Sequence, residues 1–486
     1  MTSGQLRAVL AGALVLTALF ALAFRDSPLP TAGLLAGIVV HLALVVGILR
    51  ELGSYKPGTV PIMLPTLLVA VIFGAWAPAS AISRPDFRLV SVTPSADAYA
   101  RVAIAAAFFA VAAVLACSPA RREGAAPARP PTQVRVDWYW RVGCGLTLAG
   151  IGSLFLYAVV AGVPPSAFFI TSSSGPATEQ AGGGPQFILA GIDLAISGTV
   201  LAYATQVLAP TPRRQRQFLL MASATLWLYF SLGFRYRVVV LGLALMFCRL
   251  ALTHVGRRKS SARHGRRSVV LGLMVIVAFT VTSVVRGRHE MGLPVDATAF
   301  RMDAVVDVYV RPIDVATPYA ALVARRDESE EGLLRGRSYK ELPALAVPRV
   351  LLPSKPEPVI ITEVKSATND GVGAAVPLWA EADLNFDLAG VVVLGVGVGR
   401  IGVWARRRRD PIAAAAIVSL TAPLLASVLS RSVMFWAIWQ FAFVVGPVVV
   451  AARVGRGRPS GLRRPSSLDS RPGLIGVRSP RCHGRP

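Results

Sequence analysis

The sequence predicts an all-α polytopic membrane protein, and three observations carry this prediction. Of the 486 residues, 54% are hydrophobic and 16% are charged, and the mean hydropathy is +0.56. A soluble domain carries about 25% charged residues. The hydrophobic residues gather in runs of roughly 20, which is the length that one helix needs to cross a bilayer. Short arginine-rich segments separate many of these runs, as in loops that orient membrane helices.

The apolar runs give about twelve candidate membrane spans. They are 6–24, 31–49, 59–83, 99–117, 138–163, 186–209, 217–233, 238–255, 268–285, 388–404, 411–429 and 433–452. The first run ends at Arg25 and Asp26 without a small-residue cleavage site, so we expect a first helix and not a cleaved signal. The separations between 217–233 and 238–255, and between 411–429 and 433–452, are the weakest.

The distribution of basic residues predicts the orientation of these spans. If the N-terminus is cytoplasmic, every second connection is strongly basic, as the positive-inside rule requires. These connections hold Arg50 and Lys56, then Arg121, Arg122, Arg129 and Arg135, then Arg213, Arg214 and Arg216, then six basic residues between 257 and 267, then Arg406 to Arg409. We therefore expect a multi-pass protein of the cytoplasmic (plasma) membrane with both termini in the cytoplasm.

The remaining composition excludes several classes of function. A net charge of +25 would indicate nucleic acid in a soluble protein, but here the excess lies in loops and in the tail 453–486. We expect no nucleic-acid partner, and a disordered tail attracted to anionic membrane lipids. None of the four cysteines lies in the large polar segment, so we expect no structural disulfide and no cysteine-based metal site.

One connection differs from the others. Residues 1–285 hold spans one to nine and residues 388–452 hold spans ten to twelve, whereas residues 286–387 form a polar extracytoplasmic loop. This loop has twelve Lys plus Arg and sixteen Asp plus Glu, so it lacks the basic bias of the chain. Long loops without a span are usually functional. Apolar stretches at 299–324 and 341–352 predict a partly helical cap on the outer membrane surface.

Within this loop, the segment PRVLLPSKPEP holds two cations between four prolines. Proline fixes its own backbone and restrains the residue before it. Arg349 and Lys355 would therefore lose little entropy when they meet a phosphate. The alternative interpretation is a rigid connector with incidental surface charge.

Five further arginines lie at the predicted outer boundary of the membrane, against the usual bias. They are Arg235, Arg237, Arg286, Arg288 and Arg431. Arginine binds phosphate through two parallel hydrogen bonds and keeps its charge. We therefore predict a diphosphate site at the outer leaflet. The alternative is that these side chains extend to ordinary lipid phosphates.

Candidate acid–base groups lie beside these arginines. His289 follows Arg288, and Glu381, Asp383 and Asp387 precede span ten in LWAEADLNFDLAG. A carboxylate near a membrane surface can act as a general base. The alternative, expected for most of these groups, is a set of solvated loop charges.

Three sequence elements resemble the oligosaccharide repeat-unit polymerases, the Wzy-type O-antigen polymerases. The first is SLGFRYRVVVLGL (231–243), and the second is GRSYKELPALAVPRVLLPSKP (336–356). The third is LWAEADLNFDLAGVVVLGVGVG (378–399), in which Glu381, Asn385, Phe386 and Gly390 match the family pattern. The elements cover about 170 residues in the family's order. Two departures, a Phe between Gly233 and Arg235 and aspartates around the Asn-Phe pair, leave the exact catalytic partner open.

The resemblance implies a glycosyltransferase that joins saccharide repeats carried on an undecaprenyl-type polyprenyl diphosphate, with no cofactor and no metal. Catalysis is then assigned to Arg235, Arg237, Arg349, Glu381 and His289, with Glu381 or His289 as the base. Diphosphate binding is assigned to Arg286, Arg288, Lys355, Arg431 and Asn385. The family setting adds a flippase and a chain-length regulator as partners.

Two other functions stay open. An O-antigen ligase-like transferase would use the same donor with a different acceptor. A transporter or exporter of lipid-linked saccharide would fit twelve spans, but the halves of the chain differ and few ionisable groups lie mid-span. His41 is one such group, and we expect it to serve packing or a weak hydrogen bond.

Overall fold

The computed structural model describes residues 3–24, 27–53, 62–83, 94–117, 132–162, 188, 190–231, 235–252, 284, 315–328, 334–347, 352, 354, 358–367, 376–407, 410–431 and 434–456. Every regular element in these ranges is a helix, and eight helical stretches are long and apolar enough to cross a membrane. The prediction of an all-α, membrane-embedded protein is confirmed. The count of twelve spans stays a prediction.

Long helices cover eleven of the predicted spans. They are α1 (Ser3–Ala23), α2 (Thr31–Gly53), α3 (Met63–Val71) continued by a π-helical turn η1 (Ile72–Trp76) and α4 (Ala77–Ser83), α5 (Ala96–Ala116), α6 (Gln133–Ala161), η4 (Gly191–Asp193) with α9 (Leu194–Leu208), α10 (Pro212–Ser231), α11 (Arg235–Leu252), α18 (Leu378–Arg406), α19 (Pro411–Arg431), and α20 (Met434–Val444) with α21 (Gly446–Arg456). The predicted span 268–285 lies outside the described residues apart from Val284. Both weak separations are breaks between helices, before Arg235 and before Met434.

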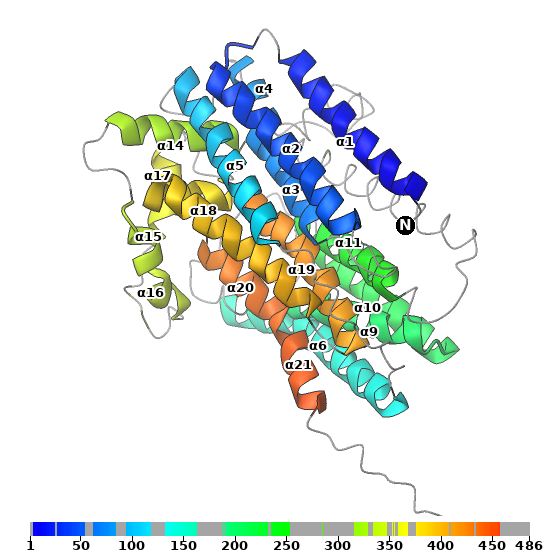
Figure 1. Cartoon of the computed structure of the whole chain (residues 1–486). Coiled ribbons are helices and arrows are strands. Elements are labelled where there is room, and N and C mark those ends of the chain that lie inside the picture. Colours follow the sequence, from blue (N-terminus) through cyan, green and yellow to red (C-terminus); the bar gives the residue numbers. More distant parts are fainter. Residues whose placement is uncertain are drawn as a thin grey trace, which may run out of the picture.

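The long helices lie side by side in one bundle (Figure 1). Helix α19 is the most buried of the eight candidate spans, and it contacts α3, α9, α11 and α18. Helix α5 lies between α2 and α18. Four short helices gather at one end of the bundle: α14 (Ala316–Glu328), α15 (Arg337–Lys340), α16 (Leu342–Ala346) and α17 (Val359–Ala367). We call these four helices the cap and this end of the bundle the cap end.

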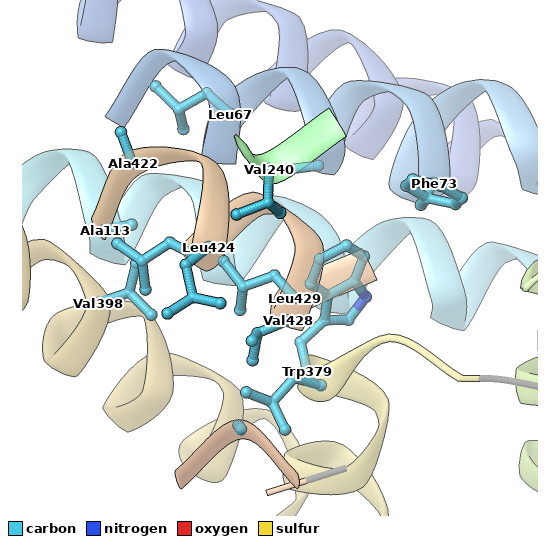
Figure 2. Packing of buried hydrophobic residues seen from close by; sticks show 14 of the residues in the cluster. Leu67, Phe73, Ala113, Val240, Trp379, Val398, Ala422, Leu424, Val428 and Leu429 are labelled. Carbon is cyan, nitrogen blue, oxygen red and sulfur yellow. The ribbon is translucent and has the colours of Figure 1, made fainter. Parts of the chain in front are cut away.

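Small residues bring the central helices close together. A Cβ at Gly395 of α18 would lie 2.6 Å from the carbonyl oxygen of Phe109, and one at Gly399 would lie 2.6 Å from that of Ala113. Both carbonyls belong to the alanine-rich helix α5. Because lipid gives no hydrophobic drive for helix association, close backbone contact of this kind supplies much of the packing energy. Figure 2 shows Ala113 beside Val398, with Leu424 of α19 nearby.

Helix α18 begins earlier than the hydropathy predicts, at Leu378 and not at residue 388. It is broken at Phe386 (φ −141°, ψ 20°) and Asp387 (φ 54°, ψ −159°). The first two turns lie at the cap end, and the longer second part forms the span. The break brings residue 390 against the first part, where a Cβ would lie 2.5 Å from the carbonyl oxygen of Ala382. Glycine at this position is therefore required by space.

We expect Gly395→Leu to destabilise the bundle more than Gly397→Leu. Overpacking of a tight contact costs about 1–3 kcal/mol, whereas Gly397 has nothing within 4 Å of its Cβ position. Thermal unfolding of the purified protein in detergent measures both variants. Equal melting temperatures for the two leucine variants would contradict the close contact between α18 and α5.

Candidate functional site

The helix directions place several polar residues at the cap end. The backbone N–H of Met434, the first residue of α20, donates to the Glu381 carboxylate at 2.6 Å, so the end of α19 and the start of α18 are neighbours. Cys248 of α11 contacts Ser419 of α19, and Val240 lies by the later residues of α19 in Figure 2. Helices α11 and α19 are therefore antiparallel, and α11 begins at the cap end.

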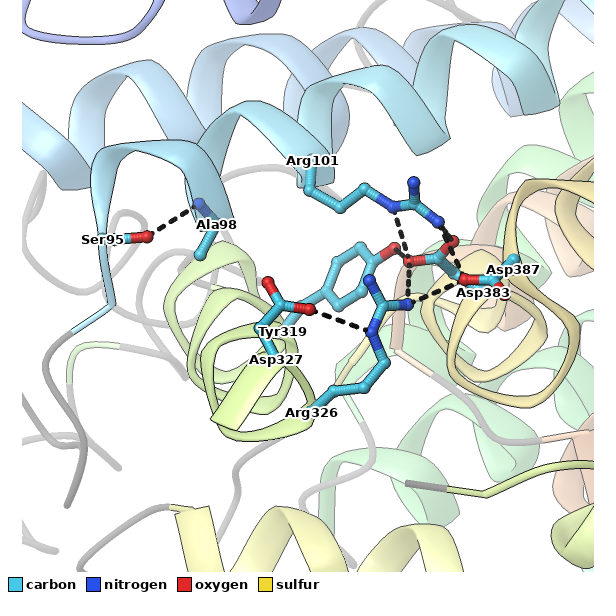
Figure 3. Close-up of polar contacts among 8 residues, drawn as sticks. All are labelled: Ser95, Ala98, Arg101, Tyr319, Arg326, Asp327, Asp383 and Asp387. Carbon is cyan, nitrogen blue, oxygen red and sulfur yellow. Dashed lines mark hydrogen bonds and ion pairs between the residues drawn. The ribbon is translucent and has the colours of Figure 1, made fainter. Parts of the chain in front are cut away.

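A buried carboxylate joins the cap to the bundle. Asp383 of α18 accepts two hydrogen bonds from Arg101 of α5, from Nη2 at 2.6 Å and from Nε at 3.2 Å. The Tyr319 hydroxyl of α14 donates to the same carboxylate at 2.8 Å, and Arg326 Nη1 lies 3.8 Å away. Both guanidinium groups also reach Asp387 (Figure 3). We call these five residues the Asp383 cluster.

The protonation state of Tyr319 suits this contact. Burial, together with the adjacent Asp383 carboxylate, raises the pKa of the Tyr319 phenol well above its ordinary value. The hydroxyl therefore keeps its proton at neutral pH and serves as a donor. Because Tyr319 is on α14, this hydrogen bond holds a cap helix against the bundle. A second contact, between the Tyr99 and Thr317 hydroxyls at 3.1 Å, ties α14 to α5 directly.

A second polar cluster lies on the other side of the same two turns of α18, where Glu381 and Asn385 are each two residues from Asp383. The Ser338 hydroxyl of α15 donates to Glu381 Oε1 at 2.7 Å and accepts from Asn385 Nδ2 at 2.9 Å. Asn385 Nδ2 also donates to the Glu381 backbone carbonyl at 2.6 Å, which fixes the orientation of the amide. The Asn385 Oδ1 atom is buried and has no hydrogen-bond partner among the described residues. Ser338, Glu381 and Asn385, with the Met434 N–H, form the Glu381 cluster.

Two aromatic rings extend this contact toward the surface. The rings of Tyr339 and Phe386 are 5.2 Å apart, and Phe386 is half exposed. Gly336, with φ of 80°, lies under Phe386, where a Cβ would be 3.1 Å from the ring. Burial raises the pKa of the Tyr339 hydroxyl, and the Glu381 carboxylate adds to the effect. The Gly-x-Ser-Tyr segment of the cap therefore lies directly on the break of α18.

Arg237 belongs to a third, separate group. Its Nε donates to Asp193 Oδ1 at 2.5 Å and its Nη2 to Asp193 Oδ2 at 3.2 Å. Both side chains are buried, and Arg237 also lies over the Tyr236 ring at 5.1 Å. Tyr229 donates to the carbonyl of the neighbouring Ile192 at 2.8 Å. The Asp193 carboxylate therefore neutralises the charge of Arg237 inside the protein. This ion pair links the start of α11 to the start of α9.

The other predicted site residues are described less fully. Arg235 and Arg431 begin and end their helices at the cap end, but only their backbones are described. The remaining candidates, Arg286, Arg288, His289, Arg349 and Lys355, lie outside the described residues. Their assignments stay predictions. Of the predicted site residues, Glu381 and Asn385 are brought together in one cluster.

The expectation of solvated loop charges before span ten is wrong for two of the acidic residues. Glu381 is 2% exposed and Asp383 is 1% exposed, because both lie on helix α18 beneath the cap. Asp387 keeps an exposed side chain, at 76%. The hydropathy pattern predicts a loop for these residues, because the apolar run of span ten begins only at residue 388.

Sequence reasoning also missed Arg101, Tyr319, Arg326 and Asp193. Arg101 and Asp193 fall inside the predicted spans 99–117 and 186–209, and a charge inside a span is itself a sign of a buried partner. Tyr319 and Arg326 carry no comparable signal. The expectation for His41 is confirmed, because Nδ1 contacts the Gly37 carbonyl at 2.8 Å and Nε2 accepts from Trp76 at 3.1 Å. Both ring nitrogens serve helix packing.

Comparison with known proteins adds nothing to this geometry. No family model, curated protein or solved structure matches the chain. Within the described parts of the chain, no three His, Cys, Asp or Glu side chains are arranged to hold a metal ion. The site therefore consists of hydrogen-bonded carboxylates, guanidinium groups, an amide and aromatic rings.

Removing one partner of the Asp193–Arg237 pair should destabilise the protein strongly. Asp193→Leu leaves a buried guanidinium without its counter-charge, which costs about 3–5 kcal/mol. The double variant Asp193→Leu with Arg237→Leu should recover most of that loss. Thermal unfolding in detergent of the single and double variants gives the coupling, and additive losses would argue against a structural pair.

Loss of the Ser338 hydroxyl should loosen the cap. Ser338→Ala leaves a buried carboxylate oxygen of Glu381 without a donor, at a cost of about 1–3 kcal/mol. Hydrogen–deuterium exchange over residues 334–347 should become faster. Ser366→Ala is the control, because Ser366 is an exposed serine of the cap whose hydroxyl contacts Arg325 and the Glu363 carbonyl and which lies outside residues 334–347. Unchanged exchange in the Ser338 variant would show that the hydroxyl does not hold α15 in place.

Proposed function

We propose that this protein is a membrane glycosyltransferase that polymerises polyprenyl-diphosphate-linked oligosaccharide repeat units into a surface polysaccharide. The reaction would take place at the outer leaflet of the cytoplasmic membrane, with both termini in the cytoplasm and twelve spans. A flippase and a chain-length regulator would act beside it. The proposal starts from the resemblance to Wzy-type polymerases.

One observation gives this proposal its main support. The second and third elements of the resemblance, about forty residues apart in sequence, meet in the Glu381 cluster and in the Tyr339–Phe386 contact. Ser338 and Tyr339 come from one element, and Glu381, Asn385 and Phe386 come from the other. If the two elements form one site, their characteristic residues should contact each other, and here they do.

The chemistry of the cap end agrees with the proposed reaction. In glycosyl transfer from a lipid diphosphate, negative charge develops on the leaving group, and preorganised cations lower the barrier. The cap end holds Arg101 and Arg326 and the backbone positions of Arg235 and Arg431. The half-exposed ring of Phe386 is a group that suits the apolar face of a sugar.

Within this proposal, Glu381 is assigned a positioning role and not the role of the base. At 2% exposure, with hydrogen bonds from Ser338 and from the Met434 N–H, its carboxylate is engaged in holding three segments together. In this arrangement Glu381 acts as a positioning residue. His289 remains the predicted general base for the acceptor hydroxyl.

Deletion of the gene, followed by analysis of lipid-linked and surface saccharides, tests the proposal. A missing polymerase should leave single repeat units where long chains stood. Plasmid-borne wild-type protein should restore the long chains. A ligase would instead leave long chains on the lipid, and a transporter would give neither pattern, so either result would reject the polymerase.

A further inference from the structure

Asp387 occupies an unusual place between two arginines. Its carboxylate lies 3.3 Å from Arg101 Nη2 and 3.1 Å from Arg326 Nη1. Figure 3 shows both guanidinium groups directed at this carboxylate and at the neighbouring Asp383. The two arginines come from different parts of the molecule, α5 of the bundle and α14 of the cap. Asp387 therefore bridges the junction from its exposed side.

The two aspartates differ in how they are held. Asp383 is fully buried and receives both edge nitrogens of Arg101 and the Tyr319 hydroxyl. Asp387 is 76% exposed, and the same oxygen receives one contact from each arginine. Arg101 Nη1 has no partner among the described residues (Figure 3). The outer edge of this guanidinium can thus still accept a larger anion.

The backbone at Asp387 is also unfavourable. Its φ of 54° and ψ of −159° lie in a region that is essentially reserved for glycine. A side chain held there costs free energy that the surrounding contacts must offset. The Asp387 carboxylate makes two ion pairs in which its own side is 76% exposed to solvent, and solvent weakens such pairs. Strain and weak pairing together mark a group that can be displaced.

We propose that Arg101 and Arg326 form an anion site for a phosphate or diphosphate group, and that Asp387 occupies this site until the ligand displaces it. Phosphate oxygens can accept two hydrogen bonds from each guanidinium, whereas Asp387 accepts one. Asp383 and Tyr319 remain in place and hold Arg101 in position. The ligand thereby replaces Asp387 as the bridge between cap and bundle.

This inference rests on the proposed function for the identity of the ligand, since the diphosphate of a lipid-linked saccharide has this chemistry. The headgroup of an anionic phospholipid has it as well. A protein can bind a diphosphate without synthesising a polymer. The anion site and the proposed function can therefore be rejected independently of each other.

The experiment measures ligand binding to the full-length protein in detergent and in nanodiscs. The probes are inorganic pyrophosphate, farnesyl diphosphate, and nanodiscs of phosphatidylglycerol compared with phosphatidylcholine. The variants are Asp387→Asn and Asp387→Gly, which remove the competing carboxylate, and Arg326→Gln, which removes one cation. Asp327→Asn is the matched control, because Asp327 is an exposed carboxylate that contacts Arg326 but not Arg101. Circular dichroism checks that each variant is folded.

Both Asp387 variants should bind the diphosphate probes about tenfold more tightly than wild type, equal to about 1.4 kcal/mol. Asp327→Asn should change affinity by no more than about twofold, the smaller effect of removing a charge that faces one arginine. Arg326→Gln should weaken binding. A gain seen with phosphatidylglycerol alone would assign the site to bulk lipid headgroups.

Equal or weaker binding in both Asp387 variants would overturn the anion site, whatever the gene deletion gives. A tenfold gain in binding, combined with normal polysaccharide after deletion, would keep the site and reject the polymerase.

Discussion

The carboxylate of Asp383 is the interaction on which the arrangement of the cap end depends. Burying an unpaired carboxylate is strongly unfavourable, so Asp383 can be inside only where Arg101 and Tyr319 meet it. One partner comes from a bundle helix and the other from a cap helix. Movement of α14 away from α5 would remove the Tyr319 donor and leave the buried carboxylate with Arg101 alone. The position of the cap is therefore coupled to the cost of burying one charge.

The break in α18 allows one helix to serve two purposes. Its first two turns carry Glu381, Asp383 and Asn385 toward the cap, while the part after Asp387 packs on α5 as a membrane span. A straight helix could not change its buried face at this point. Because Gly390 has no side chain, the second part of α18 can begin close to the first part. The polar clusters and the strained residue therefore have a common origin in this break.

The sequence could predict the helices, because bilayer thickness fixes their length and apolar character. It could also predict that Glu381 and Asn385 share a site, since both belong to one short motif. It could not predict the start of α18, because four polar residues between 381 and 387 interrupt the apolar pattern, and an apolar run of span length begins only at residue 388. Nor could it pair Arg101 with Asp383, or Asp193 with Arg237. Those contacts depend on which helices become neighbours, and the partners are far apart in sequence.

The opposite end of the bundle shows why the cap end is the better place for an anion. There, among the described residues, acids and bases form separate pairs between helices: Glu51 with Arg406, Asp137 with Arg214, and Asp410 with Arg135. The Glu51 carboxylate also accepts the Met63 backbone N–H. These pairs fix the ends of the helices relative to one another. At the cap end two guanidinium groups share two aspartates, and one of those aspartates is exposed and strained. Among the described residues, this arrangement gives two guanidinium groups one exposed and strained aspartate as a shared partner, so the proposed phosphate-bearing ligand would bind there and not at the other end.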